Sequence, residues 1–278
     1  MHFHEDPPAL ARPIGIFDSG VGGLTVLSEV QRQLPSESIL YFADTAHLPY
    51  GTRSAREICQ YVREILGWYH TRGVKRVLMA CNTSSALALD VVAPEFAMPV
   101  DGLILAAARV AVGQGRRIGV IATEATVRSQ AYTRAIRALA PGISVWEVGC
   151  PRFVPLVESG RLSSDETRLV ARQYLAPLLA QQIDTLIYGC THYPYLAPVL
   201  DEILPERVRR VNPAVAAAAQ LRTQLHSSGT AAPADNAARC EFWVSGDPGR
   251  FAWAARTWLG YSPVVQSVQP SPTAVTPT

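Results

Sequence analysis

Residues 14–25 read IGIFDSGVGGLT, and this stretch decides the fold class. Its first four residues form a continuous apolar run, which is typical of a strand buried on both faces. A glycine-rich turn follows. Apolar residues then recur at near-helical spacing until Pro35, at Leu24, Leu27, Val30 and Leu34. A buried strand that leads through a tight turn into an amphipathic helix predicts a parallel α/β fold.

The same alternation of apolar strands and amphipathic stretches continues along the chain. A helix is predicted over residues 53–70, closed by Gly73. We predict further strands at residues 39–43, 76–80, 118–122, 144–148, 185–188 and 241–244. Their continuous rather than alternating apolar character supports parallel sheets covered by helices on both faces.

Two pairs of similar segments indicate an internal repeat. Residues 14–19 (IGIFDS) resemble residues 118–123 (IGVIAT), which lie 104 positions further on. Residues 77–83 (VLMACNT) resemble residues 186–191 (LIYGCT), with their cysteines 109 positions apart. The nearly equal offsets predict two similar α/β halves related by pseudo-symmetry, each with a strand that ends in a cysteine.

Composition excludes several classes of protein. The 278 residues are 48% hydrophobic and 17% charged, as in ordinary soluble enzymes, and the net charge of +2 comes without a basic block that would bind nucleic acid. No window approaches an apolar membrane span, and the polar N-terminus has no signal-peptide core, so we expect a cytoplasmic protein. Residues 1–11 and 266–278 are predicted to be disordered tails.

The five cysteines are an odd number scattered along the chain, without a C-x-x-C pair. This pattern argues against a disulfide framework and against a structural zinc site, and we expect no metal. Cys81 and Cys190 stand out because each follows a predicted strand. Ligands of parallel sheets bind at such carboxyl ends, where a helix N-terminus favours thiolate. A single cysteine there would be read as a small buried hydrophobe, but two in matching contexts favour chemistry.

A pair of thiols suits one kind of reaction. Inverting a stereocentre with an acidic C–H bond requires a base on one face and an acid on the other. Thiols with a pKa near 8.5 can supply both forms. Such a racemase needs no cofactor, and the glycine-rich turn agrees with this expectation. It matches neither a dinucleotide fingerprint, since Thr25 replaces the last glycine, nor a phosphate-binding loop.

Taken in order, four motifs resemble the glutamate racemases: residues 18–25 (DSGVGGLT), 49–51 (PYG), 81–83 (CNT) and 189–194 (GCTHYP). The resemblance runs from about residue 12 to 262. It implies cofactor-free interconversion of L- and D-glutamate, an isomerase activity that supplies D-glutamate for peptidoglycan. It also implies that the thiol of Cys81 removes the α-proton of D-glutamate and that of Cys190 removes the α-proton of L-glutamate.

The resemblance also implies a wider set of site residues in a cleft between two domains. Asp18, His192 and Glu158 would assist the thiols. Substrate would be held by Asp18, Ser19, Pro49, Tyr50, Gly51, Asn82, Thr83, Thr126, Thr191 and His192. The first domain would be discontinuous, with residues 12–108 and 213–262, and the second would span residues 109–212. Asn212 stands where the family often has Asp; we expect it to cap a helix equally well.

Three alternatives remain at this level. Another racemase of the superfamily, such as an aspartate racemase, would share the thiol pair. A Cys190–His192 hydrolase would leave the CNT motif unexplained, and residues two apart rarely face each other. Some glutamate racemases bind DNA gyrase, and the family allows a homodimer, but no sequence feature encodes either surface.

Overall fold

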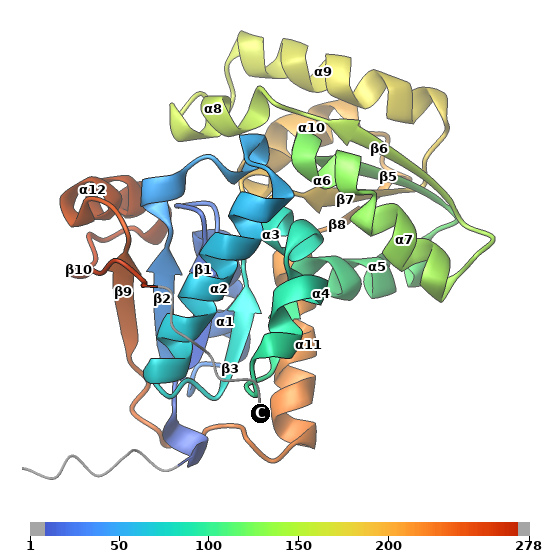
Figure 1. Ribbon diagram of the computed structural model, residues 1–278. Coiled ribbons are helices and arrows are strands. Elements are labelled where there is room, and N and C mark those ends of the chain that lie inside the picture. The colour runs from blue at the N-terminus through green and yellow to red at the C-terminus, as the bar shows by residue number, and fades with distance from the viewer. Residues whose placement is uncertain (1–8, 272–278) are drawn as a thin grey trace, which may run out of the picture.

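The computed structural model describes residues 9–271, which form two parallel sheets with helices on both faces of each (Figure 1). The first sheet has the order β10-β9-β2-β1-β3-β4. Its strands are β1 (Ile14–Asp18), β2 (Ile39–Ala43), β3 (Arg76–Met79), β4 (Val100–Gly102), β9 (Cys240–Val244) and β10 (Val265–Ser267). The second sheet has the order β6-β5-β7-β8. Its strands are β5 (Arg117–Ala122), β6 (Ser144–Gly149), β7 (Thr185–Gly189) and β8 (Arg209–Val211).

The expected repeat is present in the topology of the two sheets. In both, the first strand lies between the second and third, and the fourth follows at the outside, so that β2-β1-β3-β4 matches β6-β5-β7-β8. All neighbouring strands are parallel. The predicted fold class is therefore confirmed, and Cys81 and Cys190 follow equivalent strands, β3 and β7.

Each sheet is covered by helices on both faces, which explains the continuous apolar strands. Three helices pack on one face of the first sheet, α1 (Leu24–Gln33), α11 (Pro213–Ser227) and α12 (Pro248–Leu259). The other face packs against α2 (Ala55–Thr71), α3 (Asn82–Leu87) and α4 (Leu89–Val92).

The second sheet is covered in the same way. On one face lie α8 (Phe153–Glu158), α9 (Asp165–Ala180) and α10 (Ala197–Ile203). On the other lie α5 (Leu103–Gln114) and α7 (Ala131–Leu139), which α6 (Glu124–Ser129) precedes. The apolar side chains of both sheets are thus removed from water on each side, the main favourable contribution to folding.

The seven predicted strands are confirmed to within one residue at each end. The helix predicted over residues 53–70 is α2, which begins later because Ser54 and Glu57 form a capping box at its start. Three strands were not predicted: β4, β8 and β10 have only three residues each and contain polar or charged side chains. Their apolar runs are too short to stand out in the sequence.

The disordered tail was predicted to begin at residue 266, and this starting point is wrong. Gln266 and Ser267 belong to β10, because their backbone pairs with Trp243 and Val244 of β9. Likewise, Ala9–Ala11 forms a short 3₁₀ helix. The remainder of the two predicted tails falls largely on residues 1–8 and 272–278, which lie outside the described residues.

The proposed domain boundaries stay a prediction. The boundary after residue 108 falls inside α5, whose Leu103 and Ala106 pack in the core of the first sheet. Ile104 and Ala107 of the same helix pack in the core of the second. This helix therefore contacts both halves.

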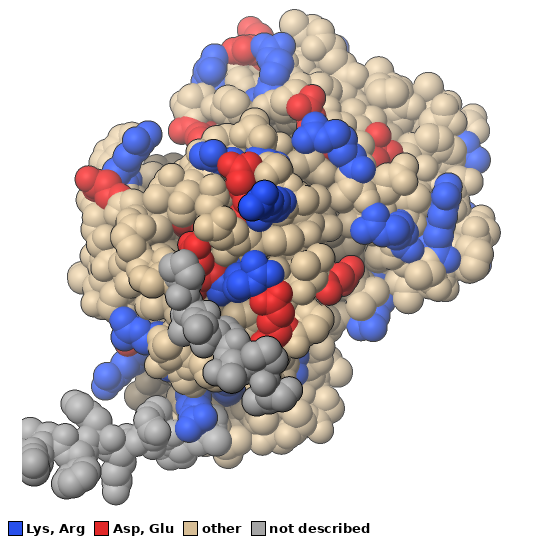
Figure 2. Space-filling view, viewed as in Figure 1, with Lys and Arg blue, Asp and Glu red and all other residues tan. Residues whose placement is uncertain are grey.

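The charged side chains at the surface are distributed as expected for a protein with a net charge of only +2. On the face in Figure 2, basic side chains lie scattered among acidic ones over a largely uncharged surface. Within residues 9–271, no helix combines the length and apolar character that crossing a membrane requires.

The close packing of Gly23, in the turn after β1, can be tested by substitution. A Cβ atom on Gly23 would lie 2.4 Å from Asp18 Cβ and 2.7 Å from Tyr41 Oη, both in the interior. We expect Gly23→Ala to lower the free energy of unfolding by roughly 1–3 kcal/mol, measured by urea denaturation. The control is Gly113→Ala in α5, where a Cβ meets nothing within 4 Å. It should be neutral or stabilise by about 0.5–1 kcal/mol. Equal stability of the two variants would contradict this account.

Candidate active site

The carboxyl ends of the two sheets face each other, and a cavity of about 410 Å³ lies between them. In Figure 1, the arrowheads of β2 and β3 point toward the second half. Cys81 lies two residues beyond β3 and begins α3, whereas Cys190 follows β7 directly. Both thiols line the cavity, so the geometry brings together the two cysteines that the sequence singled out.

The cavity also gathers nearly all of the other predicted site residues. Those that line it are Asp18, Ser19, Pro49, Tyr50, Gly51, Asn82, Thr83, Glu158, Thr191 and His192. Thr126 does not: it is fully buried behind the wall, with its hydroxyl 2.9 Å from that of Thr123 and 3.4 Å from that of Thr83. Thr123, at the end of β5, takes the place at the wall that was expected for Thr126.

Asp18 is a buried carboxylate held by both halves of the molecule. It accepts a hydrogen bond of 2.7 Å from Gly20 N and one of 3.3 Å from Thr191 Oγ1. Burial raises the pKa of Asp18 to about 6, because water no longer stabilises the charge. The charge of His192 and the hydrogen bonds limit this rise. Asp18 is thus mostly ionised at neutral pH but can accept a proton readily.

A chain of contacts leads from the second thiol to the protein surface. Cys190 Sγ lies 3.8 Å from His192 Nδ1, and His192 Nε2 lies 3.3 Å from Glu158 Oε1. Burial alone would lower the pKa of His192, but its hydrogen bonds to Cys190 and Glu158 and the charge of Asp18 raise it to about 10. His192 is therefore an imidazolium at neutral pH. The expectation that residues two apart would not face each other is wrong here, since a turn follows β7 directly.

The first thiol differs from the expectation that a helix N-terminus favours thiolate. Burial raises the pKa of Cys81 to about 12, and the charge of Asp18 contributes to the rise. The Ser84 backbone at the start of α3 opposes this rise but is outweighed. The cost of removing the thiolate from water exceeds the stabilisation by the backbone dipoles, so Cys81 is a neutral thiol at neutral pH.

Polar groups from both halves form the wall beside the thiols. Tyr132 donates a hydrogen bond of 2.6 Å to Asn82 Oδ1, and the hydroxyls of Thr83 and Thr123 lie 3.0 Å apart. Among residues 9–271, buried Asn82 Nδ2 has no hydrogen-bond partner. An unpaired buried donor carries a desolvation cost, so this amide is ready to donate to a carboxylate that enters the cavity.

The described side chains that could in principle bind a metal ion are not arranged as a metal site. Within residues 9–271, no group of three or more His, Cys, Asp or Glu side chains is placed to hold a metal ion. The proton donors and acceptors of the cavity include the Cys81 and Cys190 thiols, the Asp18 carboxylate and the His192 imidazolium.

Comparison with known proteins agrees with this chemistry. Residues 14–221 match the Asp/Glu/hydantoin racemase family. The chain belongs to this family. A glutamate racemase from Gloeobacter violaceus is 63% identical over 265 residues, which are 95% of this chain and 99% of that protein.

Solved structures of the family have the same architecture. The glutamate racemase isoform RacE1 from Bacillus anthracis is 37% identical with a TM-score of 0.89, covering 94% of this chain and 98% of that one. Glutamate racemase from Francisella tularensis, solved in complex with D-glutamate, is 34% identical with a TM-score of 0.89. That match covers 95% of this chain and all of the other.

Several residues at the cavity wall were not predicted from the sequence. Thr123 aligns with Ser19 in the internal repeat. Its position at the cavity wall could therefore have been predicted from the repeat. Cys150 follows β6, and its thiol donates to the backbone of Val148 at 3.5 Å. Arg250 reaches the cavity from α12, 168 residues (250 − 82) away in sequence from Asn82. Only the fold brings this arginine to the site.

Asn212 caps a helix, as expected. Its side chain accepts a hydrogen bond of 3.0 Å from Ala214 N at the start of α11. A neutral amide fills this capping role, and it lies outside the residues that line the cavity.

The contact between Tyr132 and Asn82 predicts a positioning role for the tyrosine. Tyr132→Phe removes the only hydrogen bond that fixes the Asn82 amide among the described residues. We expect KM for glutamate to rise about five- to tenfold, the equivalent of one hydrogen bond of about 1–1.5 kcal/mol. Steady-state kinetics with both enantiomers measure this.

The matched control is Tyr69→Phe. Tyr69 is equally buried, and its hydroxyl bonds to the backbone of Ile16 and Leu40 within the first half. This variant should lose stability without a change in KM. If Tyr132→Phe behaves like Tyr69→Phe, Tyr132 supports only the fold.

Proposed function

We propose that this chain racemises glutamate by a two-thiol mechanism, in which Cys81 and Cys190 act on opposite faces of the substrate. The reaction itself is that of the glutamate racemases, to which the chain is 54–63% identical over more than nine-tenths of its length. The chain is therefore an isomerase. The observation that carries the mechanism is the presence of both strand-end thiols at one cavity.

In the direction from L- to D-glutamate, Cys190 is the base. Its Sγ lies 3.8 Å from Nδ1 of the His192 imidazolium, and Glu158 contacts the far side of that ring at 3.3 Å. The Cα proton moves to Cys190 Sγ as the proton of the Cys81 thiol moves to the opposite face of Cα. The product leaves Cys190 protonated and Cys81 ionised.

In the reverse direction Cys81 must be the thiolate. Asp18 is the nearby base that would take its proton, but the pKa values of about 6 and about 12 make this transfer unfavourable in the empty cavity. The ammonium group of a bound substrate brings a positive charge to the site and lowers the thiol pKa. Substrate binding thus prepares the base that attacks it.

Binding of the substrate carboxylates uses the polar wall. Asn82 Nδ2 has no hydrogen-bond partner in the described part of the chain. The residues that line the same cavity include Ser19, Thr83, Thr123 and Thr191, each of which carries a hydroxyl group. Pro49, Tyr50 and Gly51 close one side. We place the reaction in the cytoplasm and its D-glutamate product in peptidoglycan synthesis, as the family motifs imply.

Cysteine variants test the mechanism. Cys81→Ala and Cys190→Ala should each lower kcat at least about 10³-fold, since each removes an obligatory proton carrier. Chiral chromatography of either glutamate enantiomer measures the activity. Cys150→Ala is the matched control, because this thiol also lines the cavity but lies outside the proposed proton path. It should stay within a few-fold of the parent chain. Full activity in either variant of the pair would exclude the two-thiol mechanism.

The pKa of Asp18 predicts the acid limb of the pH profile. In both directions kcat/KM should fall as the pH drops through about 6, because protonated Asp18 can no longer accept a proton. The two directions share the limb since the reaction equilibrium fixes the ratio of their kcat/KM values. Asp18→Asn should remove the limb and lower the rate by about 10²–10⁴.

His192→Asn provides a second arm of this experiment. The positive charge of His192 lowers the pKa of Asp18, so its loss should move the acid limb to higher pH. An unchanged limb in Asp18→Asn would show that another group controls it.

A further inference from the structure

A second hollow, here called the outer hollow, adjoins the active cavity on the side of the molecule where α8 and α12 lie (Figure 1). It has a volume of about 620 Å³, and both halves contribute to its walls. Leu48, Glu158 and Arg250 line the outer hollow as well as the active cavity. All three side chains are exposed, so the active cavity is reached from solvent beside these residues.

Acidic side chains outnumber basic ones around the active cavity. Asp18, Glu124 and Glu158 line it, against the positive charges of His192 and Arg250. Glutamate itself carries two carboxylates and one ammonium group at neutral pH, so it enters as a net anion. Carboxylates at the wall repel such a substrate unless a positive charge near its path offsets them.

His192 is poorly placed to offset these carboxylates along the path of the substrate. It is buried, and its two ring nitrogens already contact Cys190 and Glu158. Its charge is therefore used within the contacts of the second thiol. The substrate requires a cation that is exposed and has no partner in the protein.

Arg250 meets both conditions. It is exposed, and its guanidinium makes no ion pair or hydrogen bond within residues 9–271. The nearby carboxylate of Asp247 accepts instead from the Arg250 backbone N–H at 2.7 Å and caps α12. Of the described residues that line the active cavity or the outer hollow, Arg250 is the only Lys or Arg.

The surroundings of Arg250 assign it no part in the fold. Helix α12 is anchored by Phe251 and Ala255, which are buried in the core of the first sheet. Arg250 lies on the exposed side of this helix at the edge of both cavities. A change of its side chain should therefore alter the charge at the entrance without altering the packing behind it.

We propose that Arg250 attracts the substrate anion to the active cavity and lowers KM for both enantiomers. This inference rests on the proposed racemisation of glutamate. The substrate keeps its net negative charge as the proton is exchanged, so Arg250 stabilises the bound substrate and the transition state alike. Such uniform stabilisation raises kcat/KM through KM and leaves kcat unchanged. Exposed charges are screened by salt beyond a Debye length of about 10 Å at 0.1 M, so the effect depends on ionic strength.

Steady-state kinetics of full-length variants at two ionic strengths test the proposal. At about 20 mM, Arg250→Ala should lower kcat/KM about three- to tenfold through a higher KM, and Arg250→Glu should lower it further because repulsion replaces attraction. Arg250→Lys keeps the charge and should stay within about twofold of the parent chain. At about 0.5 M KCl, all three variants should lie within about twofold of the parent chain.

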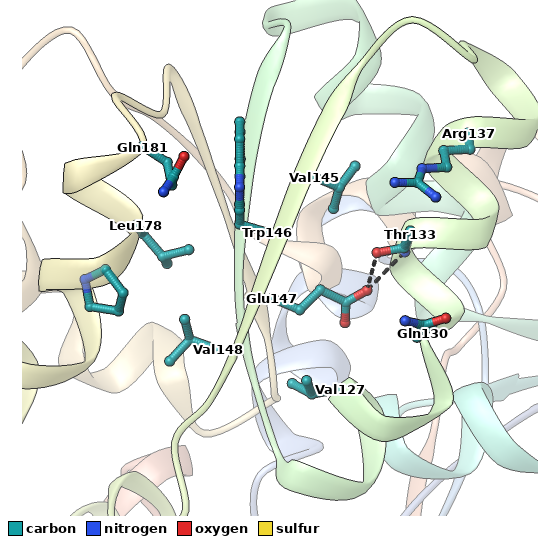
Figure 3. Close-up of a pocket in the computed structure, with 11 residues that line it drawn as sticks. Val127, Gln130, Thr133, Arg137, Val145, Trp146, Glu147, Val148, Leu178 and Gln181 are labelled. Atoms are coloured by element: carbon teal, nitrogen blue, oxygen red, sulfur yellow. Dashed lines mark hydrogen bonds between the residues drawn. The ribbon is translucent and has the colours of Figure 1, made fainter.

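The matched control is Arg137→Glu. Arg137 is also exposed, makes no ion pair or hydrogen bond among the described residues, and lies on α7 beside a separate cavity of about 430 Å³ along β6 (Figure 3). That cavity shares no lining residue with the active cavity. The variant changes the net charge of the chain as Arg250→Glu does, but it should leave kcat/KM within about twofold at both ionic strengths.

Three results would overturn the proposal. The first is a parent-like kcat/KM in Arg250→Glu at low salt. The second is a loss that appears in kcat or persists undiminished in 0.5 M KCl, roughly the salt at which screening removes long-range attraction. The third is an equal loss in Arg137→Glu, which would assign the effect to net charge alone. In each case the parent chain still racemises glutamate, whereas failure of the proposed function would appear as an inactive parent chain and would overturn both.

Discussion

The burial of Asp18 between two sheets is the constraint on which the site depends. Its carboxylate receives hydrogen bonds from Gly20 in its own half and from Thr191 in the other, and these bonds offset part of the cost of burying the charge. Thr25 adds a second contact across the same boundary by donating to Thr191 O at 3.1 Å. A buried charge without such partners would be costly. The contacts of Asp18 and Thr25 with Thr191 join the two halves beside the cavity that both strand-end thiols line.

The same burial makes two similar halves chemically unequal. Cys81 and Cys190 end equivalent strands, yet one lies beside a carboxylate and the other beside an imidazolium. The negative neighbour, together with burial, disfavours a thiolate on Cys81. Racemisation requires one base and one acid at a time. The pseudo-symmetric fold supplies the two positions, and the unlike neighbours supply the difference in charge.

The halves also differ at their edges. Strands β9 and β10 return from the end of the chain to extend the first sheet, whereas the second sheet ends at β6. This difference leaves the catalytic cavity unaffected, because the cavity lies at the carboxyl ends of the central strands rather than at the side of the sheet.

The sequence by itself determined most of the strands, the repeat and the strand-end position of Cys81 and Cys190, because buried parallel strands carry continuous apolar runs and their ends are marked by small polar residues. It missed β4, β8 and β10, whose short polar segments become strands only by pairing with neighbours. Tertiary structure alone decided that Cys81 is a neutral thiol, that Thr123 rather than Thr126 faces the cavity, and that Tyr132 orients Asn82. Each depends on burial or on contacts between segments far apart in the chain, and local sequence patterns record neither.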